Sequence, residues 1–300
     1  FRRVLFRSRE EHRTAIPTPW DLFNNLFQGG IGPGDFGLIF GNPGGGKSWT
    51  LIALGAHAVK LGFNVIHYTL ELGEDYVGLR YDACFTGVPV NAIRDFKDRV
   101  QTTITDLPGN LIIKEYSPGK ASMSTLEAHI KKCIEQDFKP DLIIIDYVDL
   151  LRSKRTGSER KEEIDDIYVS TKGLAREMKI PIWSVSQVNR SGAKDDIIEG
   201  DKAAGSYDKI MITDISISLS RKKEDKVAGT GRFHIMKNRY GGDGMTFGAK
   251  VDTATGRFEI FDDYEENEES YTPSKPVNEF SDVNVQERET LKKAFFELQS

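Results

Sequence analysis

Residues Gly41-Asn-Pro-Gly-Gly-Gly-Lys-Ser48 match the phosphate-binding loop pattern G-x-x-x-x-G-K-[ST] at every fixed position. Residues 36–40, immediately before them, form a short apolar run of the kind found in buried strands. After them, the apolar residues of 48–61 recur at helical spacing, and Gly62 is placed to end that helix. Strand, glycine-rich loop and helix in this order are the context that the motif requires. The stretch therefore predicts an α/β fold with a phosphate site, and a chance match by a glycine-rich turn is the alternative.

The chemistry of this loop follows from its glycines and from the helix behind it. Glycines let consecutive backbone N–H groups point inward as a nest for an anion, and the helix N-terminus adds partial positive charge. In this pattern Lys47 reaches the β- and γ-phosphates of a nucleotide, and the Ser48 hydroxyl binds Mg²⁺. The predicted cofactors are ATP and Mg²⁺, and the predicted nucleotide-binding residues are Gly41, Asn42, Pro43, Gly44, Gly45, Gly46, Lys47 and Ser48.

The composition is that of a protein with one large core. The 300 residues are 38% hydrophobic, which is enough for a large α/β domain with appendages. The two cysteines, Cys84 and Cys133, are too few for a disulfide framework and lack metal-ligand spacing, so they favour the reducing cytoplasm. The sequence has no secretory signal, no internal repeat and no apolar run long enough to span a bilayer. These features predict a soluble protein that does not enter a membrane.

The two ends of the chain differ from its centre. Residues 1–8 resemble one reading frame of a sequencing-library adapter, so we interpret residues 1–13 as a non-native scar, with a native basic arm as the alternative. Residues 262–300 carry eleven acidic and four basic residues, which leaves a charge of +2 for residues 1–261 out of the total of −5. The predicted organisation is therefore a main domain at 14–261 and an acidic tail at 262–300 that ends in a candidate helix at 285–299.

Apolar strands alternate with amphipathic helices along the main domain. The predicted strands after the loop helix are residues 64–70, 111–116, 142–146 and 180–187, and the predicted helices are residues 75–85, 91–100 and 161–178 and one opened by a capping box at 124–127. This rhythm predicts a mostly parallel sheet covered by helices, with ligands at the carboxyl ends of its strands. Residues 210–220, 232–238 and 245–260 then read as consecutive strands, which predicts an antiparallel extension at the C-terminal side. The apolar segment 20–27 is expected to pack beside the first strand.

Three polar residues end predicted strands at the edge where ligands bind. Asp146 follows four apolar residues and is placed to hold Mg²⁺, although a cap or turn is the alternative. Glu71 is placed to orient or deprotonate an attacking water, although a charged residue at a strand end is often merely exposed. Gln187 offers a donor and an acceptor to a γ-phosphate or to that water.

Several motifs occur in a fixed order along residues 15–261. They are the loop at 41–48, Tyr68-Thr-Leu-Glu71, Leu142-Ile-Ile-Ile-Asp-Tyr-Val-Asp-Leu-Leu151, Ser186-Gln-Val-Asn-Arg190 and Lys237-Asn-Arg-Tyr-Gly241. Together they make the chain resemble the C-terminal motor domain of hexameric replicative DNA helicases of the DnaB type, which are RecA-like ATPases of bacteria and phages. The phosphate-binding loop alone is shared by many proteins. The resemblance becomes specific to this family through three further motifs, which are Ile-Asp-Tyr, Ser-Gln-x-Asn-Arg and Lys-x-Arg.

This resemblance implies a role for each site residue. It makes Glu71 the catalytic base, Asp146 a Mg²⁺ ligand and Gln187 the sensor of the γ-phosphate. It also implies that Arg239, with Lys237 beside it, acts on the ATP of a neighbouring subunit, so that hydrolysis needs a homo-oligomer, expected as a hexameric ring. From the residues alone, a basic edge strand kept soluble by its charges is the favoured interpretation of these two cations, and the resemblance reverses it.

The resemblance further implies single-stranded DNA as a partner, with primase and a helicase loader as additional candidates. The predicted DNA-binding residues lie in two loops that follow the strands ending at 146 and 187, and they are Arg152, Arg155, Arg190, Lys202 and Gly205. A solvated basic loop is the alternative for Arg152 and Arg155. The sequence departs from the family at Asp149, where Gln is more common, and this places a second carboxylate near the metal edge.

The function predicted from these motifs is an ATP-dependent DNA helicase motor that moves 5′ to 3′, the direction being implied by the family. A RecA- or RadA-like recombinase is one alternative, although it should lack the Ser-Gln-x-Asn-Arg and Lys-x-Arg pieces. A nucleotide-switched assembly or loader protein that never unwinds DNA is another alternative, and it belongs to a different class.

Overall fold

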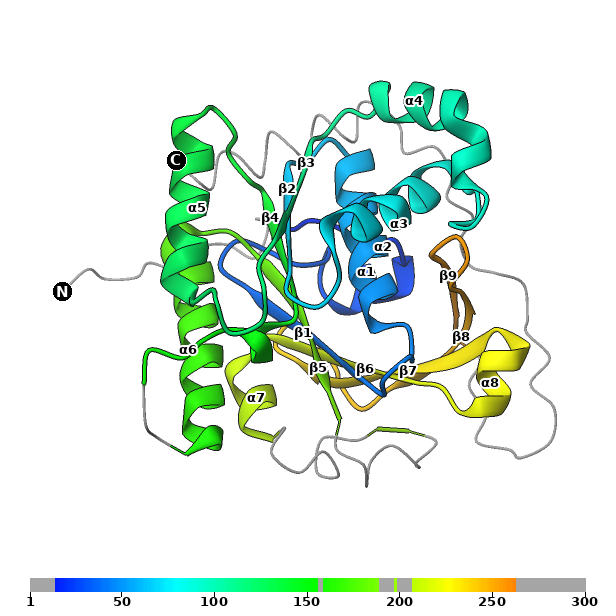
Figure 1. Ribbon diagram of the computed structural model, residues 1–300. Coiled ribbons are helices and arrows are strands. Elements are labelled where there is room, and N and C mark those ends of the chain that lie inside the picture. Colours follow the sequence, from blue (N-terminus) through cyan, green and yellow to red (C-terminus); the bar gives the residue numbers. More distant parts are fainter. Residues whose placement is uncertain (1–13, 156–158, 189–196, 199–206, 263–300) are drawn as a thin grey trace.

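The computed structural model describes residues 14–155, 159–188, 197–198 and 207–262, and within them the strands form a single nine-stranded sheet (Figure 1). The predicted tail helix and residues 1–13 lie outside the described residues. The strands are β1 (Phe36–Gly41), β2 (Val65–Thr69), β3 (Leu111–Glu115), β4 (Leu142–Asp146), β5 (Ile182–Gln187), β6 (Ile215–Ser220), β7 (Thr230–Asn238), β8 (Thr246–Asp252) and β9 (Arg257–Phe261).

Helices connect these strands and cover the sheet. They are α1 (Asp21–Leu26), α2 (Lys47–Lys60), α3 (Glu74–Thr86), α4 (Lys97–Thr105), α5 (Met123–Glu135), α6 (Arg160–Met178), α7 (Tyr207–Ile212) and α8 (Lys223–Ala228), with short 3₁₀ turns η1 (Ile93–Phe96) and η2 (Val148–Leu150). Among the described helices, none combines the length and the apolar character that crossing a lipid bilayer demands.

The sheet order is β3-β2-β4-β5-β1-β6-β7-β8-β9. Strands β1 to β6 run parallel, and β7, β8 and β9 continue the sheet in antiparallel pairs. The mostly parallel sheet with an antiparallel extension is therefore confirmed. Because parallel strands point the same way, the carboxyl ends of β1, β2, β4 and β5 meet at one edge, which is where an open α/β sheet binds its ligands.

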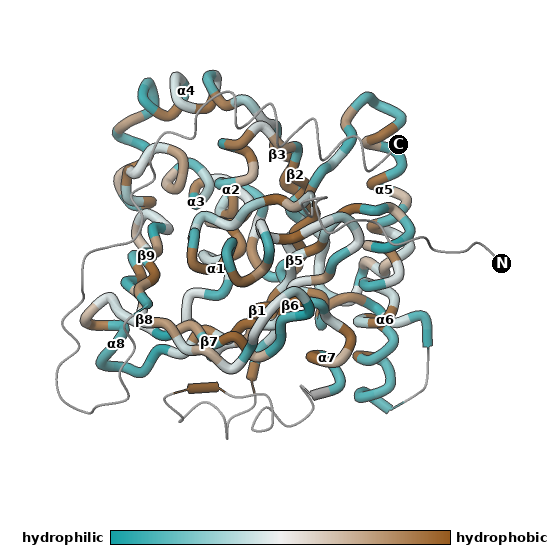
Figure 2. Tube along the Cα trace, turned by 180° about the vertical axis from the view of Figure 1, so that it is seen from behind, coloured by the Kyte–Doolittle hydropathy of each residue, from teal (hydrophilic) through white to brown (hydrophobic). Residues whose placement is uncertain are grey.

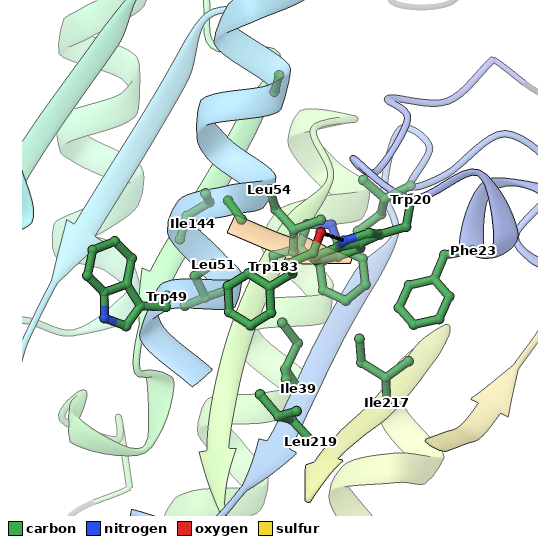
Figure 3. Packing of buried hydrophobic residues seen from close by; sticks show 14 of the residues in the cluster. Trp20, Phe23, Ile39, Trp49, Leu51, Leu54, Ile144, Trp183, Ile217 and Leu219 are labelled. Carbon is green, nitrogen blue, oxygen red and sulfur yellow. Dashed lines mark hydrogen bonds between the residues drawn. The ribbon is translucent and has the colours of Figure 1, made fainter. Parts of the chain in front are cut away.

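Both faces of the parallel sheet are buried, as the apolar strand sequences predict. On β4, Leu142 and Ile144 face the core that α1, α2 and α3 help to form, whereas Ile143 and Ile145 face the core beneath α5, α6 and α7. Figure 1 shows these two groups of helices on opposite sides of the sheet, and Figure 2 shows that the central strands are its most hydrophobic part. On the first face, the ring of Trp183 fills the space beside Gly37, where an added Cβ would lie 2.3 Å from the ring (Figure 3).

The apolar segment that contains α1 packs on more of the sheet than the first strand, beside which it was predicted. The indole Nε1 of Trp20 donates to the Phe258 carbonyl at 3.1 Å, and the Phe23 ring meets the Phe233 ring edge-on at 5.6 Å. These contacts lie on β9 and β7 rather than on β1, because the antiparallel strands supply the aromatic partners that a Trp and a Phe bury best. Ile39 of β1 belongs to the same hydrophobic cluster, so the segment packs toward the first strand and toward the antiparallel strands.

The C-terminal half contains two further corrections. Residues 210–212 belong to α7, and only Ile215 onward is a strand, which pairs parallel to β1. Residues 245–260 form two strands instead of one, because Asp252 accepts hydrogen bonds from the Ala254 N–H at 2.8 Å and the Thr255 hydroxyl at 2.5 Å and so closes a turn between β8 and β9.

The capping box of α5 also lies two residues earlier than predicted. The Ser122 hydroxyl accepts from the Thr125 N–H at 3.4 Å, and the Thr125 hydroxyl accepts from the Ser122 N–H at 3.2 Å. Glu127 instead pairs with Lys131 one turn later at 2.5 Å. A Ser/Thr pair thus caps this helix where the sequence pattern favoured Ser124 and Glu127.

Candidate functional site

The phosphate-binding loop connects the carboxyl end of β1 to the first turn of α2. Gly44 and Gly46 have φ values of 66° and 104°, a region that side chains disfavour. The Gly45 N–H donates to the Asn42 carbonyl at 3.0 Å, and a Cβ on Gly45 would lie 2.9 Å from that oxygen. These positions require glycine, and Gly46 precedes the first helical residue of α2. The loop therefore has the form of an anion cradle at a helix N-terminus.

Lys47 is buried beneath this loop, with 8% of its surface exposed. Its ammonium donates to the carbonyls of Gly41 at 2.8 Å and Asn42 at 2.9 Å. Burial lowers the pKa of Lys47 to about 8, although the charges of Asp146 and Glu71 oppose that shift. A phosphate group in the cradle would give this ammonium the anionic partner that its burial calls for.

Asp146 ends β4 and is 2% exposed. Its Oδ1 is buried and has no hydrogen-bond partner among the residues described, while Ser48 hydrogen-bonds to the carboxylate. Burial raises the pKa of Asp146 to about 6, with a smaller opposing effect from the Ser48 hydrogen bond. A carboxylate oxygen without a partner beside a serine hydroxyl fits a Mg²⁺ ion, which takes one or two protein ligands and completes its shell with phosphate and water oxygens.

The sheet register brings Glu71 and Gln187 to this edge as well. Thr69 pairs with Asp146 across β2 and β4, so Glu71 lies just beyond the end of the sheet that carries Asp146, and its side chain is exposed. Its charge raises the pKa values of both Lys47 and Asp146. Gln187 pairs with Gly41 across β5 and β1, and its Nε2 donates to the Tyr147 hydroxyl at 3.5 Å.

Lys237 and Arg239 lie at the other end of the strands, level with the amino end of β1. The Arg239 N–H donates to the Asp214 carbonyl at 3.0 Å, and the Asp214 N–H donates to the Phe36 carbonyl at 2.9 Å, so Arg239 is level with the start of β1. The loop begins at the other end of this strand, at Gly41, which is roughly 16 Å away at the usual rise per residue. The structure therefore does not bring these two cations to the loop of their own chain.

Each of these two cations is held by residues near the start of β6. The Arg239 Nη1 lies 3.2 Å from Asp214 Oδ1. The Lys237 ammonium donates to the carbonyls of Ile210 and Met211, both at 2.7 Å, which belong to the last turn of α7. Burial, followed by the charge of Arg239, lowers the pKa of Lys237 to about 8.

Of the predicted DNA-binding residues, Arg190, Lys202 and Gly205 lie outside the described residues. Arg152 and Arg155 are exposed and, together with Arg160, line a cavity of about 270 Å³ beside η2. Arg160 donates to the Asp149 carbonyl on η2 at 3.0 Å, and the Arg155 Nε lies 3.9 Å from Asp166 Oδ1, so two of the three guanidinium groups have partners. The cavity therefore lies at the same edge of the sheet as the phosphate-binding loop.

Asp149, the residue at which the sequence departs from the family, lies on η2 just after β4 and is part of a polar cluster. It forms an ion pair with Lys209, whose ammonium also donates to the Ser186 hydroxyl at 2.9 Å. The Tyr168 hydroxyl donates to the other carboxylate oxygen of Asp149 at 2.9 Å. The second carboxylate, whose role the sequence left open, is thus neutralised by a lysine.

Three cations near the loop were missed in the sequence: Arg80, Lys226 and Arg221, whose Nη1 would lie 3.9 Å from a Cβ added to Gly46. The Arg80 guanidinium lies 5.0 Å from the ring centres of both Trp49 and Tyr76, and its charge lowers the pKa of Asp146. The Lys226 ammonium donates to the Pro43 carbonyl at 3.5 Å, and its charge lowers the pKa of Lys47. The i, i+4 spacing of Tyr76 and Arg80 was a signal for the first, whereas nothing in the highly charged segment around Lys226 points to the loop.

Comparison with known proteins gives consistent matches. A protein-family profile described as the DnaB-like helicase C-terminal domain matches residues 15–247. A DnaB-like replicative helicase of Enterobacteria phage T4 is 24% identical over 246 residues, which are 75% of this chain and 50% of that protein. A replicative DNA helicase DnaB of Leifsonia xyli subsp. xyli is 25% identical over 248 residues, 78% of this chain and 54% of that protein. The chain spans about half the length of the curated relatives it matches.

Two solved structures share the fold. One, described as an ATPase domain, aligns with a TM-score of 0.72 at 20% identity and covers 84% of this chain and 93% of that one. A DnaB-like replicative helicase, described together with its interactions with primase, aligns with a TM-score of 0.72 at 20% identity over 84% of this chain and 64% of that one. The predicted RecA-like fold is thus confirmed. Because the family profile matches well over half of the sequence, the chain belongs to the family described as the DnaB-like helicase C-terminal domain.

Proposed function

We propose that this chain is the motor of a replicative DNA helicase. In this proposal it hydrolyses ATP at interfaces between subunits, translocates on single-stranded DNA in the 5′ to 3′ direction and unwinds duplex DNA. Membership of the family and the names of the relatives from phage T4 and Leifsonia xyli support it. A hexameric ring in the cytoplasm, with a primase and a loader as partners, completes the proposal.

At the carboxyl edge of the sheet, this chain supplies the groups that bind the nucleotide. The glycine cradle and the N-terminus of α2 hold the phosphates, and Lys47 moves its ammonium from loop carbonyls to phosphate oxygens. Ser48 and the unpartnered oxygen of Asp146 hold Mg²⁺. When bound, Mg²⁺ neutralises charge on the β- and γ-phosphates.

Two further residues at this edge act on the attacking water. Glu71 is exposed at the end of β2 and accepts the proton of the water as it attacks the γ-phosphate. Gln187 lies across β5 from the loop and orients that water or the γ-phosphate with its amide group. Charge then develops on the transferred phosphoryl group. Arg232, the cation of β7 that the register places level with the loop, is already paired with Asp225 through both of its terminal nitrogens.

The position of Arg239 is the observation that carries the proposal. It lies at the opposite end of the strands from its own loop, with its side chain 42% exposed. In the assembly, Arg239 and Lys237 would therefore contact the nucleotide bound to a neighbouring subunit. An arginine of this kind increases phosphoryl-transfer rates by about 10³ to 10⁵ in other nucleotidases.

The DNA contacts are proposed at the edge that carries the nucleotide. Arg152 and Arg155 line the cavity beside η2 and are placed to bind phosphate oxygens without reading the bases. Arg190, Lys202 and Gly205 remain predictions from the sequence. The proposed DNA-binding loops follow β4 and β5, and the nucleotide loop follows β1, which is next to β5 in the sheet. In this proposal, a change at the nucleotide on hydrolysis therefore shifts the DNA-binding loops.

A forked-duplex unwinding assay tests the proposal. We expect strand release with ATP and Mg²⁺, and none with a non-hydrolysable ATP analogue or with the Lys47→Ala variant. A recombinase would exchange strands between homologous duplexes without releasing the forked strand. An assembly or loader protein would hydrolyse ATP and leave the fork intact, and either result would contradict the proposed function.

A further inference from the structure

Asp214, which the sequence analysis did not single out, lies between α7 and β6 and is 2% exposed. Its Oδ2 accepts a hydrogen bond from the Phe36 N–H at 2.8 Å and pairs with the Lys172 ammonium. Lys172 also donates to the Gly34 carbonyl at 2.7 Å. The carboxylate is therefore fixed from two sides, by the start of β1 and by α6, independently of any contact with Arg239.

The second oxygen of this carboxylate holds Arg239. Asp214 Oδ1 lies 3.2 Å from the Arg239 Nη1, and the backbone N–H of Arg239 donates to the Asp214 carbonyl. Among the described residues, Nε and Nη2 of Arg239 make no hydrogen bond. One edge of the guanidinium is thus bound to the protein, while the remaining donors stay available on a side chain that is 42% exposed.

We propose that Asp214 is a positioning residue that presents the Arg239 guanidinium to the nucleotide of the neighbouring subunit. This inference rests on the proposed function, because it assigns a purpose to Arg239 only in an assembly. A guanidinium held through one nitrogen keeps the donors with which it binds a phosphoryl group in a fork. A long side chain that is already oriented loses little freedom when the phosphoryl group arrives.

The charges around Asp214 support the same role. Lys172, Lys237 and Arg239 surround one carboxylate, and Asp214 raises the pKa of Lys237 against the lowering effects of burial and Arg239. Without the negative charge of Asp214, the neighbouring ammonium groups would repel the guanidinium from its present place. Conversely, if Arg239 swings to the neighbour, the carboxylate keeps Lys172 and the Phe36 N–H, so no buried charge loses all its partners.

The test is Asp214→Asn in the full chain, assayed for ATP hydrolysis in the presence of single-stranded DNA. We expect kcat to fall about 100-fold with KM nearly unchanged, because a displaced catalytic group costs rate more than binding. Binding of a fluorescent ATP analogue measures the concentration of sites with a folded phosphate-binding loop. Dividing the rate by this concentration gives kcat per folded site, so partial unfolding is not mistaken for a lower rate.

Mixing subunits separates positioning of Arg239 from a purely structural effect. Arg239→Ala subunits mixed with Glu71→Ala subunits should recover activity, because some interfaces combine an intact arginine with an intact base. Asp214→Asn subunits should be rescued by Glu71→Ala subunits in the same way, but not by Arg239→Ala subunits. Failure of the first mixture would contradict the action of Arg239 between subunits, and with it the proposed function and this inference.

Asp141→Asn is the matched control. Asp141 is also a fully buried carboxylate just before a parallel strand, and it accepts the Asn64 N–H at 2.8 Å. We expect this variant to lose stability but to keep its rate per folded site. If Arg239→Ala is rescued while Asp214→Asn shows a normal or increased kcat, or a loss that Glu71→Ala subunits do not repair, the positioning role is wrong and the proposed function stands.

Discussion

Lys47 and Asp146 are oppositely charged groups that the fold buries beside each other, and burial penalises the charge of both. The pKa of Lys47 is lowered to about 8, and that of Asp146 is raised to about 6. Each group gains a natural partner only when phosphates and Mg²⁺ are present. The nucleotide site is therefore expected to lower the stability of the protein without its ligands, as sites built for charged ligands commonly do.

The Asp146→Asn variant tests this expectation through pH. The folded-state pKa of about 6 lies above the ordinary 3.8, so between these values the folded protein holds a proton that the unfolded chain has lost. The contribution of Asp146 to stability consequently falls as pH rises through this window, by up to about 3 kcal/mol. In EDTA at pH 7.5, urea unfolding should show the variant to be more stable than the wild type by up to that amount. The difference should vanish near pH 4, and a variant less stable than wild type at pH 7.5 would contradict the argument.

Lys47→Ala tests the phosphate-binding loop directly. The variant removes the buried ammonium that donates to the loop carbonyls of Gly41 and Asn42, so we expect ATP hydrolysis to fall by at least about 100-fold. Steady-state phosphate release is the measurement. Lys60→Ala serves as a control, since Lys60 is a lysine at the other end of α2 that donates to the Cys84 carbonyl. Normal turnover in the first variant would remove the loop from the mechanism.

At the scale of elements, the edge of the sheet that carries the site is joined to α7 and α6 through the polar cluster around Asp149. This residue lies on η2, which follows the metal-binding strand, while Lys209 lies on α7 and Ser186 lies next to Gln187 on β5. The side chains of Asp149 and Lys209 are 13% and 10% exposed, so their ion pair is largely shielded from water. The pair, with the hydrogen bond from Lys209 to Ser186, holds α7 and η2 against the end of β5. The predicted DNA-binding loop that follows β5 runs to α7.

Lys209→Met should therefore be costly. It leaves the Asp149 carboxylate buried without a cation, which destabilises a protein by about 3 kcal/mol. The double variant Asp149→Asn with Lys209→Met removes both charges and should recover part of this loss. Urea unfolding of the wild type, both single variants and the double variant gives the coupling free energy. Strict additivity of the two single changes would show that the pair contributes nothing.

At the scale of the whole molecule, the sheet separates the two halves of the proposed catalytic site. The loop, Asp146, Glu71 and Gln187 meet at the carboxyl edge, whereas Arg239 lies at the other end of the strands beside Asp214. In the proposed function, one copy therefore binds a nucleotide away from its own Arg239, and its Arg239 acts on the nucleotide of another copy. Only an assembly of several copies unites them.

This separation predicts that ATP turnover per subunit depends on protein concentration. On dilution below the range in which subunits associate, turnover should fall by at least about 100-fold, since the arginine contributes about 10³ or more in related chemistry. Phosphate release measured in parallel with sedimentation velocity checks this prediction. The Arg239→Ala variant is the control, because its slow turnover should not change with concentration. Full activity in a monomeric sample would contradict the arrangement.

Local patterns in the sequence were sufficient for much of this description. The glycine loop, the apolar strands and the helical repeats are properties of neighbouring residues, and the resulting parallel sheet is confirmed. Asp146, Glu71 and Gln187 could be assigned to one edge because each ends a strand and parallel strands end together. The same local reasoning was wrong at α7, where residues 210–212 were predicted as strand and are helical. It was also wrong between β8 and β9, where a short polar turn at Asp252 interrupts the apolar pattern.

The tertiary structure alone decided which charges meet. Asp149 and Lys209 are 60 residues apart in the chain, and Lys172 and Asp214 are 42 apart, so no sequence spacing indicates either pair. The position of Arg239 opposite its own loop likewise depends on β7 running antiparallel to β6. A periodic pattern in the sequence shows only which face of a helix or strand is buried. The partner of a charged side chain depends on how helices and strands pack against each other, and this packing is determined when the whole sheet assembles.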